Sequence, residues 1–508
     1  MEFSQTSWSI LIFLFIFILF LFYLIRVLIN LLRKRVLCDC EICQTYISSS
    51  WVSQFPNLCD WYTHLLSKSP TQTIHLHVLE NIITANPTNV EYMLKTKFEN
   101  FPKGKPFSMI LGDLLGRGIF NVDGDLWKFQ RKMANLELGR NSIRSYAFEV
   151  IHHEIQHRLI PLLDSFLGKE QHHGTLDLED VFKRFSFDCI CKFSFGLDPK
   201  CLEISLPLSK FSSSFDLASN LSAKRALHIS PIIWKIKKIL NMGSEKKLKK
   251  AIRNINVLAK EMIRQKRKLG IHSPEHKDLL SKFMVTINDE TYLRDIVISF
   301  ILAGRDTVAS ALTSFFWHMA KNPHVQTFIL NEADKILGGN QDCITSCDKL
   351  RDLHYLQASV HESMRLLPGI QFDSKFCLQD DVLPDGVFVK KGTRVTYHPY
   401  AMGRMEKIWG QDCLKFKPER WLTENGQFSQ ENPFKYPVFQ AGLRVCLGKE
   451  MAIIQLKTVA ISLLRRFRIE LVEEEGSSSS SPLFLPGLTA TFSGGLPVLV
   501  QERWAKDE

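Results

Sequence analysis

The sequence lacks several features that would assign it to a common functional class. It contains no nucleic-acid-binding module and no internal repeat. Its 12 cysteines do not follow the spacing of a disulfide framework, which favours a reducing compartment over a secreted scaffold. Residues 10–25 carry no charged side chain. The net charge of +11 therefore points to an anionic membrane surface or an acidic protein as partner, and to no nucleic acid.

The uncharged stretch is nearly long enough to cross a bilayer. The apolar run extends past Arg26 and Asn30 to about Leu32, close to the ~20 residues that a spanning helix needs. A cleaved signal peptide would carry basic residues before this run and a small-residue cleavage site after it. Here Glu2 precedes the run and Arg33-Lys34-Arg35 follows it. The positive-inside rule predicts an uncleaved, single-pass signal anchor with the body of the protein in the cytosol.

We divide the chain into a transmembrane signal anchor over 1–32, a polar tether over 33–58 and one large domain over 59–508. The chain is 45% hydrophobic, which is ample for a large core. Helical periodicity dominates the large domain. The tether contains Cys38-x-Cys40-x-x-Cys43, a density that suggests a metal site, but no matching pair of ligands follows. The sequence therefore favours free thiols next to the membrane.

Two β-rich patches are expected, at 73–78 and 382–395, with hairpin turns at Asp385-Gly386 and Lys391-Gly392. The basic runs 246–250 and 260–268 are expected on solvated helix faces, and 473–482 reads as a low-complexity spacer.

Near the C-terminus, one cysteine stands in a glycine-bearing loop directly before an apolar helical pattern over about 450–464. The loop reads Phe439-Gln-Ala-Gly442-Leu-Arg444-Val-Cys446-Leu-Gly448. A thiolate at a helix N-terminus is stabilised by unpaired backbone N–H groups and by the helix dipole. The glycines let the backbone approach the sulfur, and Arg444 can neutralise an acidic cofactor group. This presentation is typical of an axial haem ligand, although a single cysteine is more often an ordinary buried thiol.

This loop resembles the haem-binding loop of the cytochromes P-450, and the resemblance covers essentially the whole chain. It implies a mainly α fold with small β-sheets, in which one large haem domain follows an N-terminal transmembrane helix. Cys446 would be the axial ligand of the iron in haem b. Phe439, Gly442, Arg444 and Gly448 would surround the cofactor. Trp127-x-x-x-Arg131, two side chains one helical turn apart, would lie beside a haem propionate.

A long apolar helical pattern over 293–318 contains Ala303-Gly304-Arg305-Asp306-Thr307, residues that are unfavourable inside a buried helix. Such a conflict is expected at a functional site. The resemblance implies that Gly304 leaves room for oxygen and substrate, that Thr307 hydrogen-bonds oxygen and that Asp306 helps to relay protons. The alternative is a glycine kink with Thr307 bonded back to the backbone.

Glu362 and Arg365 share the face of a helix that ends at Pro368. With Arg420 they resemble the family's buried Glu-Arg-Arg network, and we expect them to have a structural role. His398 would either reach a propionate or be an ordinary core histidine.

Within the family, the chain is most similar to the plant clan of fatty-acid ω-hydroxylases, and in it to the branch that oxidises jasmonoyl-amino acid conjugates. Two positions depart from the clan's pattern. Leu443 replaces a frequent Pro before the loop Arg, and Gly369 replaces the second Pro of a Pro-Pro pair where substrates are usually contacted. The stretches that carry the similarity are 101–107, 112–121, 303–307, 371–375 and 393–404.

The resemblance implies NADPH- and O2-dependent terminal (ω) hydroxylation of jasmonoyl-isoleucine or its 12-hydroxy form, and repeated turnover would give the carboxylic acid. Electrons would come from NADPH through a separate cytochrome reductase at the endoplasmic reticulum membrane. Three alternatives stay open: a general fatty-acid ω-hydroxylase of cutin- and suberin-type lipid metabolism, a peroxide-rearranging enzyme of the same fold, and a non-catalytic haem carrier or sensor. The last two would not need Thr307 and Asp306.

Family positions also predict an apolar channel for a small apolar acid or amino-acid conjugate, although several of these residues would equally suit the core. Arg117 and Lys375 are the candidates for anchoring a substrate carboxylate. Lys128, Lys132 and Lys449 are expected to dock an acidic surface of the reductase. The lining candidates are Phe107, Ile110, Leu114, Phe120, Ser299, Phe300, Ala303, Ile370, Phe372 and Leu488.

Overall fold

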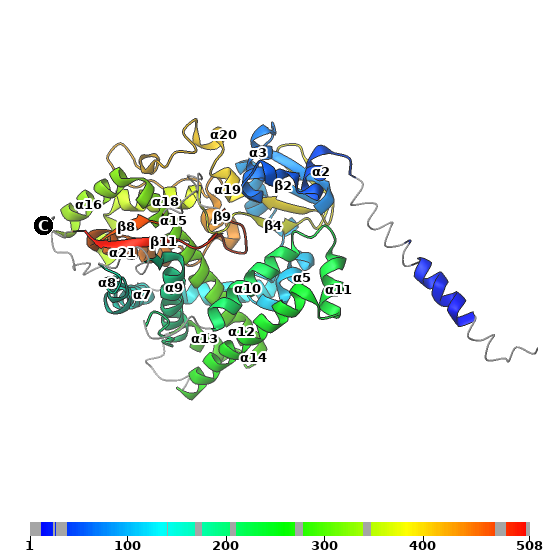
Figure 1. The fold of residues 1–508 in the computed structure, drawn as a ribbon, viewed down its shortest axis with the longest axis horizontal. Helices are drawn as coiled ribbons and strands as arrows, with labels where there is room; N and C mark the ends of the chain where they lie inside the picture. Colours follow the sequence, from blue (N-terminus) through cyan, green and yellow to red (C-terminus); the bar gives the residue numbers. More distant parts are fainter. Residues whose placement is uncertain are drawn as a thin grey trace, which may run out of the picture.

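The computed structural model describes residues 12–23, 26, 38–139, 141–167, 175–203, 210–269, 278–338, 347–472 and 484–503. This part of the chain is mainly helical with small β-sheets, as predicted (Figure 1). An apolar helix, Ile12–Tyr23, lies near the N-terminus and is exposed along its length. The other α-helices are α2 (Glu41–Ser48), α3 (Leu58–Lys68), α4 (Pro87–Glu91), α5 (Gly104–Leu115), α6 (Gly124–Leu138), α7 (Asn141–Glu154), α8 (Ile160–Asp164), α9 (Leu178–Phe195), α10 (Lys210–Arg225), α11 (Pro231–Ile239), α12 (Gly243–Lys268), α13 (Leu279–Thr286), α14 (Glu290–Ile301), α15 (Thr307–Lys321), α16 (Pro323–Leu337), α17 (Cys347–Arg351), α18 (His354–Leu366), α19 (Pro399–Met402), α20 (Glu406–Trp409) and α21 (Lys449–Arg466).

The largest sheet has the order β1-β2-β7-β4, formed by Thr73–Leu76, Asn81–Thr84, Arg394–Tyr397 and Asp373–Phe376. Strands β2 and β7 are parallel, and the other two pairings are antiparallel. This sheet packs near α3 at one end of the molecule (Figure 1). The smaller sheets are β3 (Leu176–Asp177), β11 (Pro497–Glu502) and β8 (Phe467–Leu471); β5 (Asp381–Val382) with β6 (Phe388–Val389); and β9 (Phe484–Leu485) with β10 (Thr491–Phe492).

A long helical rod runs through the interior. It consists of α14, a π-helical turn η6 (Leu302–Asp306) and α15. Glu290–Lys321 is long and apolar enough to cross a membrane, but 72% of its most apolar window is buried inside the protein. Its hydrophobicity therefore reflects a core position, because a helix that is apolar on all sides must be covered.

The described part of the chain has three large apolar cores, and two of them include residues of this rod. One joins α9, α15, α18 and α21, and a second joins α5, α10, α12 and α14. The third lies between the largest sheet and α3. The loop that carries Cys446 precedes α21, so packing of α21 against α15 and α18 fixes that loop relative to the rod.

One of the two predicted hairpin turns is present, at Asp385-Gly386; the turn at Lys391-Gly392 joins β6 to β7, which belong to different sheets and do not pair, so the second prediction is wrong. Asp385-Gly386 joins β5 to β6, and Gly392 adopts a φ of 84° just before β7. Both basic runs lie on α12, but Lys266 differs from the expectation because it is buried and pairs with Asp278 at 2.6 Å. The predicted spacer 473–482 lies outside the described residues.

The predicted tether is folded where it is described. From Glu41 onward it forms α2, and Cys43 is fully buried in the core beside the largest sheet. Packing of Cys43 explains why this part of the segment is helical in a stretch that reads as polar. The three-part division of the chain stays a prediction.

Candidate active site

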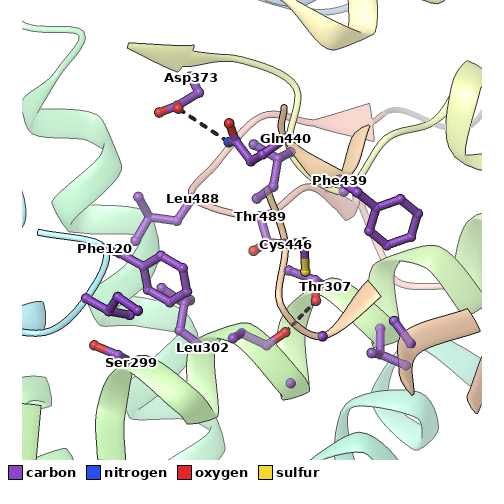
Figure 2. A pocket seen from close by; sticks show the side chains of 18 of the residues that line it. Phe120, Ser299, Leu302, Thr307, Asp373, Phe439, Gln440, Cys446, Leu488 and Thr489 are labelled. Atoms are coloured by element: carbon purple, nitrogen blue, oxygen red, sulfur yellow. Dashed lines mark hydrogen bonds between the residues drawn. The ribbon is translucent and has the colours of Figure 1, made fainter. Parts of the chain in front are cut away.

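A cavity of about 480 Å³ opens where the first two cores meet. Its volume lies within the range typical of sites for small molecules and cofactors. The loop before α21 contributes one wall, the π-helical turn and its flanking residues contribute another, and α5, α9 and α10 contribute further residues. Most of the lining is apolar, and the Cys446 thiol and the Thr307 hydroxyl both belong to it (Figure 2).

Cys446 is presented to the cavity by a tightly packed loop. Its backbone N–H donates to the Phe439 carbonyl at 2.8 Å. Gly442 has a φ of 63°, and a Cβ there would lie 2.0 Å from the Leu94 carbonyl oxygen, so both conformation and space require glycine. Gly448 is less constrained, because its Cβ would lie 4.0 Å from the Cys446 sulfur.

The environment of Cys446 keeps it a thiol until a metal binds. The side chain is open to the cavity, but protein surrounds it and burial raises its pKa. The Gly448 N–H and the charges of Arg131 and Lys449 act in the opposite direction without cancelling this effect. Coordination to iron removes such a proton outright.

Two guanidinium groups lie at the cavity with unused donors. Arg444 donates to Asp123 at 2.6 Å and to the Val122 carbonyl at 3.0 Å, and it lies 4.6 Å over the Trp127 ring. Its Nε atom is buried without a hydrogen-bond partner in the described part of the chain. Arg131 also lines the cavity. Trp127 does not, and its ring packs against the Arg444 guanidinium instead. Burial lowers the pKa of both arginines, as expected for cations that await an anion.

These features fit a haem. The thiol is the soft ligand that haem iron takes in oxygen-activating proteins. The orphaned Nε of Arg444 and the Arg131 guanidinium suit the two carboxylates of the porphyrin. The apolar walls suit its ring. His398 differs, because it is fully buried and its Nδ1 accepts the Ala401 N–H at 3.2 Å, which matches the core-histidine interpretation.

Thr307 sits where the π-helical turn gives way to α15. Its hydroxyl donates to the Ala303 carbonyl and at the same time faces the cavity (Figure 2). The back-bonded geometry considered from sequence is therefore present, and it leaves the oxygen lone pairs free to accept a hydrogen bond. A π-turn inside an α-helix is common at functional sites. Gly304 also lines the cavity, and a Cβ there would lie 2.4 Å from Ile190 on α9.

Asp306 does not belong to the cavity lining in the described part of the chain. Its carboxylate pairs with the buried Arg305 at 2.5 Å, and Arg305 also pairs with Asp216 on α10 at 2.7 Å. Burial raises the pKa of Asp306, and Arg305 partly opposes this. The Asp216 side chain is 41% exposed. The ion pairs Asp306–Arg305 and Arg305–Asp216 therefore extend from the residue that precedes Thr307 to solvent.

Nine of the ten predicted lining residues lie at the cavity: Phe107, Ile110, Phe120, Ser299, Phe300, Ala303, Ile370, Phe372 and Leu488. Leu114 is the exception. It is fully buried in the second core, while Leu111 and Leu115 of the same helix line the cavity instead. Leu114 lies four residues after the cavity-lining Ile110, so helical spacing does not separate it from the lining face, and only its packing in the second core does.

Neither candidate anchor for a carboxylate lies at the cavity. Arg117 pairs with Asp289 at the surface. Lys375 is buried and donates to Asp373 at 2.8 Å. Burial lowers the pKa of Lys375 to about 7, with Asp373 opposing and Lys103 adding to the shift.

Several polar residues of the cavity were missed from sequence, above all Arg394. Arg394 on β7 lines the cavity, donates to Ser374 at 2.9 Å and to the Ala226 carbonyl at 3.1 Å, and forms no ion pair with any described carboxylate. Lys103, Asp373 and Gln440 are also missed, and Gln440 donates to Asp373 at 3.3 Å (Figure 2). Arg394 begins β7, and the other three residues of this strand are buried. Its place in a predicted strand was the one sequence feature that could have indicated a position near the interior.

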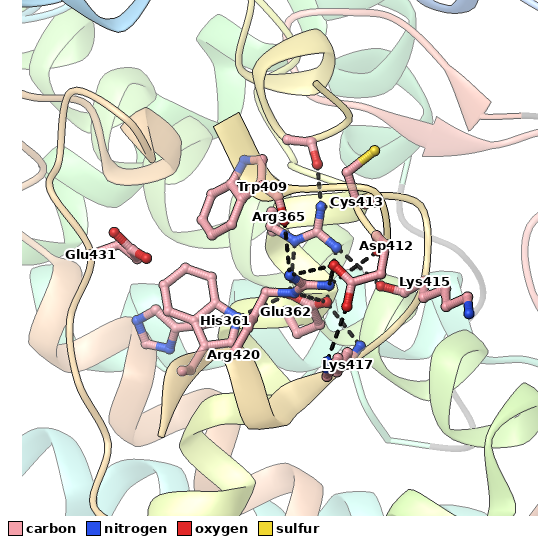
Figure 3. A network of polar contacts seen from close by, with 12 residues as sticks. His361, Glu362, Arg365, Trp409, Asp412, Cys413, Lys415, Lys417, Arg420 and Glu431 are labelled. Carbon is pink, nitrogen blue, oxygen red and sulfur yellow. Dashed lines mark hydrogen bonds and ion pairs between the residues drawn. The ribbon is translucent and has the colours of Figure 1, made fainter. Parts of the chain in front are cut away.

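Glu362, Arg365 and Arg420 converge in one network, in which Glu362 and Arg365 are fully buried and the Arg420 side chain is 10% exposed (Figure 3). Arg365 binds Glu362 through two N–H groups at 2.7 and 2.8 Å, and Arg420 donates to it at 2.9 Å. Trp421 Nε1 and the Lys417 N–H complete the carboxylate's partners. Arg365 also donates to the Gly403, Cys413 and Lys415 carbonyls, so the network ties α18 to the chain segment that leads toward the cysteine loop.

The two departures from the clan's pattern have different settings. Leu443 is exposed. Gly369 lines the cavity, and its carbonyl accepts the Ala490 N–H at 2.8 Å. A Cβ at Gly369 would make ordinary contacts, 3.5 Å from Ser310, so the space gained by glycine is open to substrate.

Comparison with known proteins agrees with this geometry. Residues 53–489 match the family model for Cytochrome P450. The chain is 56% identical to Cytochrome P450 94C1 of Arabidopsis thaliana over 98% of this chain and 99% of that protein. It is 46% identical to Cytochrome P450 94B1 of the same plant, with 88% of each chain covered. It is 44% identical to Cytochrome P450 94A1 of Vicia sativa, over 87% of this chain and 86% of that one.

Proposed function

Since this chain belongs to the cytochrome P450 family and is a monooxygenase of its plant 94 group, we propose that it hydroxylates the terminal methyl of jasmonoyl-isoleucine or of its 12-hydroxy form. One observation carries the proposal. A single apolar cavity holds a thiol, a hydroxyl at a π-turn and a guanidinium without a carboxylate partner in the described part of the chain. The resemblance of 101–107, 112–121 and 371–375 to the jasmonate-oxidising branch supports the substrate class.

We assign the cofactor's position to the cysteine loop. Haem bound through Cys446 supplies the oxygen chemistry that the side chains of this cavity lack. Arg131 and Arg444 would hold its carboxylates, and Phe439, Gly442 and Gly448 would shape the loop around the thiolate. Trp127 would act indirectly, by holding Arg444 in place.

The overall reaction needs O2, two electrons from NADPH and two protons. One oxygen atom enters a C–H bond as hydroxyl and the other leaves as water. We propose that the Thr307 hydroxyl, whose hydrogen is donated to the Ala303 carbonyl, accepts a hydrogen bond in the cavity through its oxygen. Asp306 would deliver protons by leaving Arg305 and turning toward Thr307, and Asp216 would connect it to solvent.

Arg394 is the best-placed anchor for a substrate carboxylate. Burial lowers its pKa and Asp373 acts in the opposite direction, but an arginine stays charged at neutral pH, so the cavity contains a cation that forms no direct ion pair with a described carboxylate. An amino-acid conjugate offers a carboxylate for this group and an apolar chain for the walls formed by Phe107, Phe300 and Leu488. Holding one end of a flexible substrate limits which carbon reaches the reactive centre.

The proposed setting is the endoplasmic reticulum membrane, with a separate NADPH–cytochrome reductase as electron donor. The exposed apolar helix Ile12–Tyr23 supports membrane attachment near the N-terminus.

Product analysis tests the substrate assignment. Microsomes that contain this chain and a plant reductase would receive jasmonoyl-isoleucine, its 12-hydroxy form and a medium-chain fatty acid, each with and without NADPH. We expect NADPH-dependent oxidation of the conjugates at the highest rate, and mass spectrometry would count the oxidation steps. Turnover of the fatty acid alone would instead identify a general ω-hydroxylase. No turnover with any substrate would favour a haem carrier, and turnover without NADPH a peroxide-rearranging enzyme.

Arg394 gives a sharper test of substrate binding. Arg394→Gln removes a charge-assisted contact, and we expect kcat/KM for jasmonoyl-isoleucine to fall about 10–100-fold, mainly through KM. The methyl ester of the same substrate is the control, because it lacks the charge. An equal loss for acid and ester would contradict the anchoring role, and Arg394→Lys should retain part of the preference for the acid.

A further inference from the structure

Three cysteines of one short segment, 38–43, lie close to a histidine that directly follows strand β1. Cys38 Sγ lies 3.3 Å from Cys40 Sγ and 3.6 Å from His77 Nδ1, and Cys40 Sγ lies 3.8 Å from the same nitrogen. The ligand atoms of Cys38, Cys40, Cys43 and His77 all lie within 4.8 Å of one another. None of the four lines the haem cavity.

Local structure explains this convergence. Cys40 directly precedes α2 and Cys43 lies in its first turn, so their three-residue spacing puts both sulfurs on one side. Strand β1 ends at Leu76, and His77 begins the 3₁₀ turn η2 (His77–Leu79). The next residue of that turn, Val78, donates its N–H to Cys43 Sγ at 3.4 Å. One turn therefore provides both a ligand and a backbone donor of the kind that supports metal-bound thiolates.

We propose that Cys38, Cys40, Cys43 and His77 bind one Zn²⁺ ion. Three thiolates and one imidazole form a standard tetrahedral set for structural zinc. With Zn–S of about 2.3 Å and Zn–N of about 2.0–2.1 Å, tetrahedral donors lie about 3.5–3.8 Å apart. The two sulfur–nitrogen distances, 3.6 and 3.8 Å, match this spacing, and the Cys38–Cys40 sulfur–sulfur distance of 3.3 Å requires only a small opening.

The chemistry of the cluster selects against other occupants. Ca²⁺ and Mg²⁺ require oxygen ligands, which this cluster does not offer. A disulfide between Cys38 and Cys40 would need a sulfur–sulfur distance of about 2.05 Å, and it would leave Cys43 and His77 without a role. Four protein donors also fill a tetrahedral shell, so the ion would have no open position and its role would be structural.

Zinc would fasten the start of the folded domain. Cys38, Cys40 and Cys43 lie at the first described residues after 27–37, and His77 belongs to the β1–β2 connection of the largest sheet. The ion would cross-link these two segments in the same place where Cys43 packs into the third core. We therefore expect zinc to hold α2 on the catalytic domain directly after the predicted membrane anchor.

Metal analysis of the purified full-length holoenzyme tests this site. We expect about one zinc per haem by elemental mass spectrometry, and a zinc K-edge X-ray absorption spectrum with three sulfur neighbours and one nitrogen neighbour. The iron of haem absorbs at a different edge and does not interfere. Absence of zinc after equilibration with Zn²⁺, a shell of oxygen and nitrogen only, or another metal in its place would overturn the proposal.

Variants locate the ion. Cys40→Ser and His77→Ala should each lose most of the zinc, whereas Cys201→Ser and His75→Ala should keep it. Cys201 lies away from the cluster, and the ring of His75 lies 3.9 Å from that of His77 without belonging to the ligand set, so these are matched controls. Zinc retained in Cys40→Ser and His77→Ala would show adventitious binding elsewhere and refute the site. The carbon monoxide difference spectrum should be unchanged in all four.

A measurement on the unmodified protein covers the case in which the variants do not fold. Titration with a mercurial thiol reagent in the presence of a metallochromic zinc indicator should release the zinc in step with modification of about three thiols. Limited proteolysis should then cut near α2 faster than in the untreated enzyme. Zinc release without loss of thiols, or thiol modification without zinc release, would contradict a thiolate-bound ion.

Discussion

At the scale of single residues, Cys446 and Thr307 illustrate how position in the fold gives an ordinary side chain a particular chemistry. Cys446 has its pKa raised by burial, so metal binding and loss of its proton are coupled. Thr307 is already oriented by the Ala303 carbonyl, which reduces the entropy lost when it binds a further partner. Both depend on the backbone around them, and each role can be tested by removing one functional group.

Cys446→Ala should abolish the thiolate-type absorbance of the carbon monoxide complex, because alanine cannot ligate iron. The carbon monoxide difference spectrum of purified protein provides the measurement. Cys201→Ala, which removes a half-buried thiol that does not line the cavity, should leave the spectrum unchanged. A thiolate-type spectrum in Cys446→Ala would end the assignment of this residue as ligand.

Thr307→Ala should lower the amount of product formed per NADPH consumed severalfold, because protons would no longer be delivered in a controlled way. Parallel measurement of NADPH oxidation and product by mass spectrometry tests this. Thr313→Ala is a matched control: Thr313 makes the same back-bond, to Ala309 at 2.8 Å, but does not line the cavity. Equal coupling in the two variants would show that Thr307 serves only the helix.

At the scale of secondary-structure elements, the buried network around Glu362 joins α18 to the segment before the cysteine loop. Burial alone would raise the pKa of Glu362, but Arg365 and Arg420 outweigh it and hold the pKa below the ordinary value of 4.5. The carboxylate is therefore ionised at neutral pH. A group with a lowered folded-state pKa contributes stability above its unfolded pKa and loses that contribution as the pH falls through the folded value.

Glu362→Gln should destabilise the protein by about 3–5 kcal/mol at neutral pH, because the fully buried Arg365 guanidinium loses its carboxylate partner, while Arg420 keeps Asp412. Thermal unfolding followed by circular dichroism, with haem retention as a second readout, measures the effect. The difference between wild type and variant should shrink below about pH 4.5, where the wild-type carboxylate begins to be protonated.

Glu431→Gln provides the control for that experiment. Glu431 forms a partly exposed pair with Lys435 at 2.8 Å, and such pairs contribute about 0–1 kcal/mol. A loss in Glu362→Gln no larger than the loss in Glu431→Gln would show that the network does not stabilise the fold.

At the scale of the whole molecule, part of the positive net charge lies on the protein surface near the cysteine loop. Lys128 and Lys132 are exposed on α6, the helix that also carries Trp127 and Arg131. Lys449 is only half-buried and its charge acts on Cys446, so it cannot be altered without disturbing the site. Long-range attraction toward an acidic reductase would raise the association rate and weaken with added salt.

Lys128→Glu with Lys132→Glu should slow reduction by the reductase several-fold at low salt, with little change in substrate-induced spectral shifts. Stopped-flow reduction under carbon monoxide measures this. Lys246→Glu with Lys250→Glu makes the same change of charge on the exposed face of α12 and should have a smaller effect. Identical reduction rates in the two double variants would place the docking surface elsewhere.

The amino-acid sequence by itself determined the family and the helical fold, and nine of the ten lining residues that it predicted lie at the cavity, because these depend on local order. The Cys446 loop, the helix with Thr307 and the Glu362–Arg365 pair each lie within one short segment, and their resemblance to the family's motifs implied their roles. Leu114 was assigned wrongly to the cavity because position along α5 does not say which face the neighbouring helices cover.

Only the tertiary structure decided which distant side chains meet. Arg394 reaches the cavity because β7 pairs between β2 and β4, and no local pattern marks it as an unpaired cation. His77 completes the set of Cys38, Cys40 and Cys43 although at least 33 residues lie between it and these cysteines, where the sequence had offered no fourth ligand. The physical reason is the same in both cases. The register of the largest sheet and the packing of α2 beside it bring together groups that are far apart along the chain, and distance along the chain does not predict distance in space.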